Sequence, residues 1–290
     1  MPTVRTNDIE TYYERRGDGP PVVFIHGMIM TATMWESQLG ALDDAFTTIA
    51  YDVRGHGRTG GADRNPYSID LFASDLAVLL DELDIDRTVV CGLSMGGAIA
   101  QAFAAAHPER VAGLVLADTF PPGPLPLTGR LALANIRFLA RLDRLINYKT
   151  LNRWQLRVGN LLLPGVSGDE VTIQRIVDES PTIPHAEFVK IADATARFPK
   201  DSIDLSRVTA PTLILHGEHL PMANEEITGQ LVRQLTSTDP TVHVVPGSGH
   251  ASNLDNPEFF TARLQEFLTG CVYSARPEDN DDPSDAGESP

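Results

Sequence analysis

Hydrophobic residues along this chain form short runs that alternate with amphipathic stretches. In the stretches between several of these runs, apolar positions recur at helical spacing, as in Ser68–Leu83, where Ser68 is placed to cap a helix. This alternation predicts an α/β fold with a mostly parallel sheet and helices on both faces. Ile9–Arg15 is expected to be an antiparallel leading strand. The other expected strands are Pro21–Ile25, Thr47–Tyr51, Thr88–Cys91, Val111–Ala117, Pro211–His216 and Thr241–Val245.

One long segment interrupts the alternation. Residues 121–206 start with a turn-rich Pro-Pro-Gly-Pro and then have four helical patterns, Gly129–Ile146, Leu151–Leu163, Asp169–Val177 and His185–Ala196. We interpret this segment as a helical cap inserted into a core of residues 1–120 and 207–272. A cap of this kind would shape a substrate pocket. Its apolar residues are expected either to line that pocket or to pack the cap on the core: Phe138, Leu139, Leu142, Trp154, Leu161 and Leu162.

The stretch Thr88–Gly97 is the main candidate for chemistry. An apolar run ends in Gly92-Leu93-Ser94-Met95-Gly96, and a helix of small residues is expected to follow. A serine at such a strand-to-helix turn is held in a strained conformation with its hydroxyl exposed, and the glycines give the turn room. The helix N-terminus can stabilise an oxyanion. We interpret Ser94 as a nucleophile; the alternative is a glycine-rich packing turn.

The best candidate for the base is His250. It lies in a glycine-rich loop after the last expected strand, so it can reach over the sheet edge toward Ser94. The order of serine before histidine along the chain suits this arrangement. The alternative is an exposed loop histidine.

The amino-acid composition disfavours some classes of partner. The 290 residues include 23 Lys and Arg against 39 Asp and Glu, a net charge of −16, which disfavours nucleic acid as a partner. With only three lysines, the acidic balance suggests a salt-rich cytoplasm or a GC-rich genome. Residues 273–290 are rich in Asp, Glu, Pro and Ser and are expected to be disordered. Cys91 and Cys271 form no disulfide framework pattern, and Cys91 is expected to be a buried thiol.

The motifs together resemble the α/β-hydrolase superfamily. They are His26-Gly27, Asp52 to Gly57, Gly92 to Gly97, His216-Gly217-Glu218 and Gly249-His250, and the stretch ending at Gln101 is similar to 3-oxoadipate enol-lactonases and carboxylesterase-like proteins. The resemblance implies an eight-stranded, mostly parallel sheet with an inserted helical cap.

The resemblance also implies roles for individual residues. Ser94 would be the nucleophile and His250 the base, with the backbone N–H groups of Met28 and Met95 as the oxyanion hole. No metal or organic cofactor is expected. His26 and the turn of Asp52, Arg54 and His56 are expected to be structural.

The sequence departs from the superfamily at the acid of the triad. The position that usually holds Asp is Leu220, which cannot stabilise an imidazolium ion. We favour Asp118, at the end of the expected strand after the nucleophile, with Glu218 as the alternative. A third possibility is that no acid exists and turnover is weak or absent, because loss of the acid lowers the rate by about four orders of magnitude.

The sequence therefore predicts a serine hydrolase that cleaves a carboxylic ester or lactone through an acyl-enzyme. Alternatives are C–C, thioester or perhydrolase chemistry at the same site, or a ligand-binding protein of the same fold. A small-molecule substrate is expected, with no nucleic-acid or membrane partner. The chain has neither a leading apolar segment nor an apolar run of about 18 residues, so we expect a cytoplasmic location.

Overall fold

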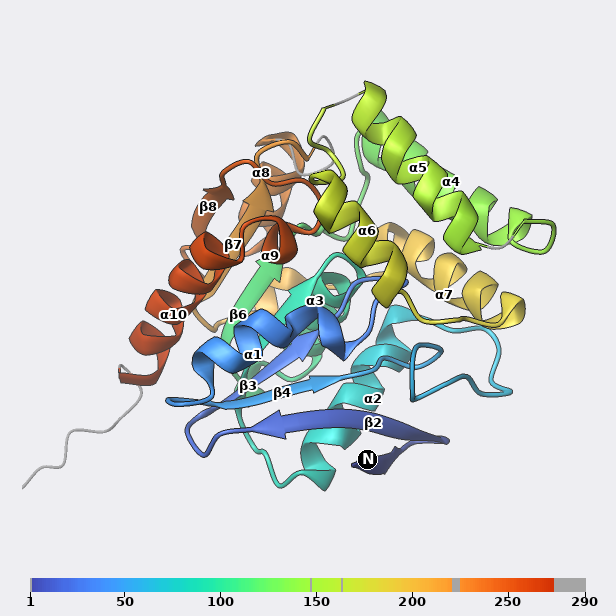
Figure 1. The fold of residues 1–290 in the computed structure, drawn as a ribbon. Coiled ribbons are helices and arrows are strands. Elements are labelled where there is room, and N and C mark those ends of the chain that lie inside the picture. The colour runs from blue at the N-terminus through green and yellow to red at the C-terminus, as the bar shows by residue number, and fades with distance from the viewer. Residues whose placement is uncertain (1, 147, 163, 221–224, 274–290) are drawn as a thin grey trace, which may run out of the picture.

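The computed structural model describes residues 2–146, 148–162, 164–220 and 225–273, and these residues form a mostly parallel sheet with helices on both faces (Figure 1). The sheet has eight strands in the order β1-β2-β4-β3-β5-β6-β7-β8. The α/β class is confirmed, together with the expected strands. Their bounds are β1 Thr3–Thr6, β2 Ile9–Arg16, β3 Pro21–Ile25, β4 Thr47–Tyr51, β5 Thr88–Leu93, β6 Val111–Ala117, β7 Thr212–Gly217 and β8 Thr241–Val245.

The first two strands differ from the rest of the sheet. β1 pairs antiparallel with β2, and β2 pairs antiparallel with β4, whereas all later pairs are parallel. The antiparallel leading strand is thereby confirmed. β1 gave no signal of its own because it has only four residues, of which only Thr6 is buried.

Two helical layers cover the sheet, and alternate residues of each strand face opposite layers. Val90 and Leu114 belong to the core beneath one layer, and Cys91 and Val115 to the core beneath the other. The first layer holds α2 (Ile69–Glu82), α3 (Met95–Ala106) and α8 (Glu225–Gln234). The second holds α1 (Glu36–Leu42), α9 (Ser252–Asp255) and α10 (Pro257–Tyr273).

Two local predictions from the sequence hold. Ser68 caps α2, and its side chain accepts a hydrogen bond from the Leu71 N–H. Cys91 is a fully buried free thiol, and burial raises its pKa. Both features follow from short-range sequence patterns.

Four α-helices lie between β6 and β7, as the interrupted pattern predicted. They are α4 (Leu127–Leu142), α5 (Tyr148–Leu162), α6 (Glu170–Glu179) and α7 (His185–Arg197). α4 packs against α7 and α5 against α6. In Figure 1 α4 and α5 lie at the top of the view, and β2 lies near the bottom. The division into a core and a cap of residues 121–206 stays a prediction. The predicted disordered tail lies outside the described residues except for Tyr273, the last residue of α10.

Four short 3-10 helices complete the described chain: Ala32–Trp35, Pro108–Arg110, Phe198–Lys200 and Leu205–Arg207. Among the described helices, none combines the length and the apolar character that crossing a membrane requires.

Candidate active site

Ser94 stands at the sharp turn between β5 and α3. Its backbone adopts φ 57° and ψ −114°, a conformation rare for a residue with a side chain. Close packing imposes the turn: a Cβ on Gly92 would collide with the carbonyl oxygen of Gly96, and one on Gly96 with that of Ile25. Thr119 Oγ1 also donates to the Ser94 carbonyl at 2.8 Å. The two glycines of the motif therefore make room for the strained serine.

His250 lies in the loop after β8 and reaches the serine. Its Nε2 is 2.9 Å from Ser94 Oγ. Burial lowers the pKa of His250 to about 4, so the ring is neutral near pH 7 and Nε2 can accept the serine proton. The backbone N–H of His250 donates to the carbonyl of Val166, in the connection between α5 and α6, at 3.2 Å. The structure thus brings the two predicted groups within hydrogen-bond distance of each other, the spacing that a nucleophile and its base require.

The other ring nitrogen lacks the expected carboxylate. His250 Nδ1 is buried and has no hydrogen-bond partner among the described residues. Asp118 instead accepts three hydrogen bonds, from Gly217 N–H at 2.9 Å, Ser252 N–H at 3.0 Å and Ser252 Oγ at 2.6 Å. Burial raises the pKa of Asp118 to about 7, although these three donors lower it.

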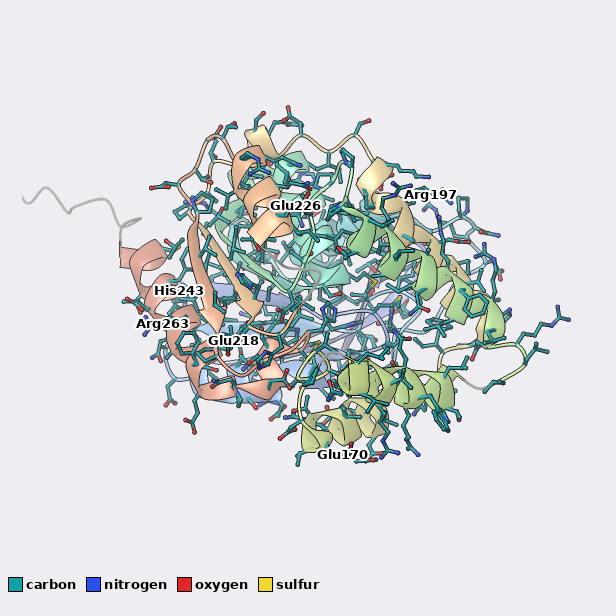
Figure 2. All side chains as sticks on the ribbon, turned by 90° about the horizontal axis from the view of Figure 1, so that it is seen from above. Glu170, Arg197, Glu218, Glu226, His243 and Arg263 are labelled. Atoms are coloured by element: carbon teal, nitrogen blue, oxygen red, sulfur yellow. The ribbon has the colours of Figure 1, made fainter. Side chains whose placement is uncertain are left out.

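Glu218, the alternative acid, is exposed and directly follows β7; it is labelled in Figure 2. Its carboxylate accepts the Gly247 N–H at 2.8 Å. The bond predicted between a carboxylate and His250 Nδ1 is therefore absent for Asp118 and for Glu218 in this structure. Leu220, at the position usual for the acid, is buried in the wall of the cavity beside the histidine.

Two carboxylates hold the backbone on either side of His250. Asp118 binds Ser252, two residues after the histidine, and Asp255 Oδ2 accepts the N–H of Gly249, one residue before it, at 2.8 Å. Asp118 also has positive φ, 46°, at the end of β6. Sequence reasoning missed Asp255, because an Asp five residues after a histidine carries no pattern that reveals this backbone contact.

The two predicted oxyanion donors are near the serine. The Met95 N–H belongs to the first turn of α3 and therefore has no partner within the helix. Met28 lies in the turn closed by the bond from Met30 N–H to Gly27 carbonyl, and Met28 and Ser94 line the same cavity. His26 Nε2 accepts the Val53 N–H at 2.9 Å, as expected for a residue that orients this loop.

Buried charged side chains stabilise the turn after β4, which was expected to be structural. Asp52 accepts backbone N–H groups of Ala32 and Arg58, each at 2.8 Å. Arg54 is fully buried and forms two hydrogen bonds of 2.7 Å with Asp75. None of these bonds involves Ser94 or His250, and neither Asp52 nor Arg54 lines the cavity above them, which supports a structural role.

An apolar cavity of about 380 Å³ opens above Ser94 and His250. Its lining comes from strand ends and from α4 to α7, and the described lining residues include no Lys, Arg, Asp or Glu. Of the apolar residues singled out in the sequence, Leu139 lines this cavity. The expectation was wrong for four others, which neither line it nor pack the helices on the core but are 60–81% exposed: Phe138, Trp154, Leu161 and Leu162.

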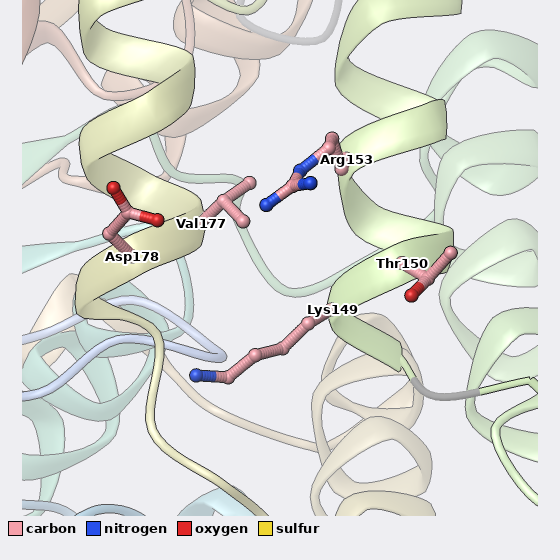
Figure 3. A pocket seen from close by; sticks show the side chains of 5 residues that line it. All are labelled: Lys149, Thr150, Arg153, Val177 and Asp178. Carbon is pink, nitrogen blue, oxygen red and sulfur yellow. The ribbon is translucent and has the colours of Figure 1, made fainter.

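A second hollow, of about 240 Å³, lies between α5 and α6 (Figure 3). It is lined by Lys149, Thr150, Arg153, Val177 and Asp178, and neither Ser94 nor His250 contributes to it. Within the described ranges, no group of three or more His, Cys, Asp or Glu side chains is arranged to hold a metal ion.

Comparison with known proteins agrees with this geometry. The sequence profile of the alpha/beta hydrolase family matches residues 22–263. The chain belongs to this family. A putative non-heme chloroperoxidase from Synechocystis sp. is 28% identical over 280 residues, which cover 90% of this chain and 95% of the relative.

Two other similar proteins extend the comparison. The 3-oxoadipate enol-lactonase 2 from Acinetobacter baylyi is 34% identical over 119 residues, 40% of this chain and 44% of that protein. The structure of a thermophilic esterase from Thermogutta terrifontis has a TM-score of 0.77 at 28% identity, covering 93% of this chain and 99% of that one. The resemblance to α/β hydrolases of the esterase and enol-lactonase kind is confirmed.

Proposed function

We propose that this α/β hydrolase cleaves a carboxylic ester or lactone through an acyl-enzyme on Ser94. The observation that carries the proposal is the 2.9 Å contact between Ser94 Oγ and His250 Nε2 at the floor of an apolar cavity. Ser94 attacks the carbonyl carbon while its proton passes to Nε2, and the N–H groups of Met28 and Met95 bind the oxyanion. His250 then gives the proton to the leaving oxygen, and water completes the cycle by the same steps.

Asp118 is the proposed acid of this system. Its carboxylate is buried and bound to Ser252, two residues from His250, so its negative charge acts on the imidazolium ion across a region that excludes water. Its hydrogen bonds also fix the loop that carries the ring. This effect is weaker than that of a carboxylate bonded to His250 Nδ1. We therefore expect substitution of Asp118 to lower kcat less than the loss of a directly bonded acid would.

The cavity favours an uncharged, apolar acyl group. A buried charge without a partner is costly, and none of the described lining residues is a Lys or Arg that could pair with a substrate carboxylate. A volume of 380 Å³ corresponds to about a dozen water molecules and hence to a substrate of about a dozen non-hydrogen atoms. We therefore propose a neutral medium-chain ester or lactone.

Hydrogen peroxide is the second candidate as acyl acceptor. The 28% identical relative described as a putative non-heme chloroperoxidase supports considering it. In that reaction His250 Nε2 takes a proton from hydrogen peroxide as the peroxide oxygen bonds to the acyl carbon. The bond to Ser94 Oγ then breaks, His250 gives that proton to the serine oxygen, and a peracid leaves. The active-site residues are the same in both reactions.

The test is labelling with a fluorophosphonate probe, followed by kinetics on esters and lactones with acyl chains of two to twelve carbons. We expect labelling of the wild type and none of Ser94→Ala, with kcat/KM highest for neutral chains of middle length. Equal labelling of both proteins would refute the nucleophile. Preference for a dicarboxylic ester over its neutral analogue would refute the substrate class, and peracid formation faster than hydrolysis would favour peroxide.

A further inference from the structure

The hairpin of α4 and α5, residues 127–162, carries most of the large hydrophobic side chains that are exposed in the described chain. Nine of the twelve large hydrophobic side chains that are exposed lie in this hairpin. On α4 Leu127, Leu131 and Phe138 share one face because they are four and seven residues apart, and on α5 Trp154, Val158 and Leu161 are spaced by four and three. These six side chains are 43–81% exposed.

The same two helices line the cavity with their other side. Leu133 and Ile136 of α4 and Leu151 and Leu156 of α5 lie in the cavity wall. The outward stripes are therefore additional to the apolar residues that hold the helices over the site. Exposed apolar side chains gathered on neighbouring helices in this way are typical of a place where a protein meets a partner or a membrane.

The hairpin is also basic although the protein is acidic. Residues 127–162 contain seven Lys and Arg and a single Asp, whereas the whole chain has 23 basic and 39 acidic residues. Some of this charge is balanced locally, because Arg137 and Arg141 pair with Asp193, and Arg157 with Glu170. Arg130 and Arg144 are exposed, and Arg153 projects into the hollow between α5 and α6 (Figure 3).

An anionic lipid surface matches both properties. An amphipathic helix with Leu, Phe and Trp on one face and Arg beside it lies in the interfacial region of a membrane, and anionic lipids attract the cations. A twofold dimer through this face would instead bring two basic hairpins together. We propose that the α4–α5 hairpin docks on membranes that contain anionic lipid and so presents the cover of the cavity to the bilayer.

This proposal replaces the expectation that the protein has no membrane partner. That expectation rested on the absence of a long apolar run, which reveals a spanning helix but not one that lies on a surface. The proposal does not depend on the reaction catalysed, because none of the six outward side chains lines the cavity.

The experiment uses the full chain with vesicles of phosphatidylcholine alone or with 30% phosphatidylglycerol, at low and high salt. Trp154 is 68% exposed and Trp35 is fully buried, so a blue shift of tryptophan fluorescence on adding vesicles reports on α5. We expect binding and a blue shift with the anionic vesicles at low salt and a loss of both at high salt. Co-sedimentation measures the bound fraction.

Two variants separate the apolar and the electrostatic contributions to vesicle binding. Arg130→Gln/Arg144→Gln/Arg153→Gln is expected to weaken binding to anionic vesicles about 100-fold, since each cation near the surface contributes about fivefold. Phe138→Ser/Leu161→Ser is expected to abolish the blue shift. The matched control is Val242→Ser/Val244→Ser, two exposed apolar residues of β8.

Hydrolysis of a short, water-soluble ester by both hairpin variants should match that of the wild type, which shows that they fold. The proposal is overturned if the wild type does not bind anionic vesicles, or if the hairpin variants bind as well as the control. It is also overturned if the wild type is a dimer in solution that Phe138→Ser/Leu161→Ser converts to a monomer, because the stripes would then be a contact between copies.

Discussion

Ser94 and His250 form one candidate site, but different forces hold them in place. The serine is fixed by contacts among near neighbours, in which Gly92 and Gly96 allow β5 and α3 to meet closely. The loop that carries the histidine is fixed mainly by groups far away in the sequence, Asp118 at the end of β6 and Val166 in the connection between α5 and α6. Asp255 of α9, five residues after the histidine, adds a local contact. A nucleophile turn can therefore be recognised from a short motif, whereas the orientation of the base depends on the assembled fold.

Replacing the proposed nucleophile, Ser94, should lower kcat more than any other substitution considered. Ser94→Ala is expected to lower kcat about 10⁶-fold, because both covalent steps pass through its hydroxyl oxygen. Ester hydrolysis under saturating substrate is the measurement, and Ser237→Ala, an exposed serine, is the control. Residual activity within 100-fold of the wild type would show that another group carries the reaction.

Asp118→Asn tests whether the Asp118 carboxylate assists His250 as the proposed acid. We expect kcat to fall about 100-fold with little change in KM, less than the roughly 10⁴-fold loss for a directly bonded triad acid. Glu218→Gln is the matched control and should change kcat less than twofold, because this carboxylate is exposed. Unchanged kcat in Asp118→Asn would refute Asp118 as the acid, and a 10⁴-fold loss would indicate a direct bond during turnover.

The pH profile of the wild type should carry the signature of Asp118. Its raised pKa, about 7, means that the carboxylate forms as the pH rises through 7, so kcat/KM should increase across that range. The lowered pKa of His250, about 4, keeps the base neutral throughout. Asp118→Asn should remove the step near pH 7. A step that persists in this variant would belong to the histidine and contradict the assignment.

Leu220→Asp tests whether a carboxylate at the position usual for the acid improves catalysis. We expect kcat/KM for a neutral ester to fall about tenfold, because a charge enters an apolar cavity wall and Asp118 is the proposed acid. Leu220→Asn, which is similar in size but uncharged, separates the loss of the apolar contact from the effect of charge. A gain of more than tenfold in Leu220→Asp would mean that the native chain lacks a working acid.

The smallest effect is expected at Asp255. Asp255→Asn weakens the bond to the Gly249 N–H and should lower kcat about fivefold while KM is unchanged, because only the orientation of the base is affected. Asp81→Asn, an exposed carboxylate on α2, is the control. An equal rise of KM would instead place the effect on the shape of the cavity.

Much of the fold could be predicted because its signals are local. Buried parallel strands give continuous apolar runs, and the cap of α2 is set by Ser68 and a bond three residues away. β1 escaped prediction because four largely exposed residues give no pattern. The helices between β6 and β7 were predicted by type, but the direction of their apolar faces was not, since Leu139 faces the cavity and its neighbour Phe138 faces outward.

The sequence by itself indicated the α/β class and identified Ser94 and His250 as candidates, because a Gly-x-Ser-x-Gly turn and a glycine-rich loop after the last strand are local patterns. Only the tertiary structure decided what surrounds the histidine. Asp118 and Ser252 are 134 residues apart, and their hydrogen bonds exist only once β6, β7 and the histidine loop have assembled. Contacts of that range are set by packing of the whole sheet, which no local pattern encodes.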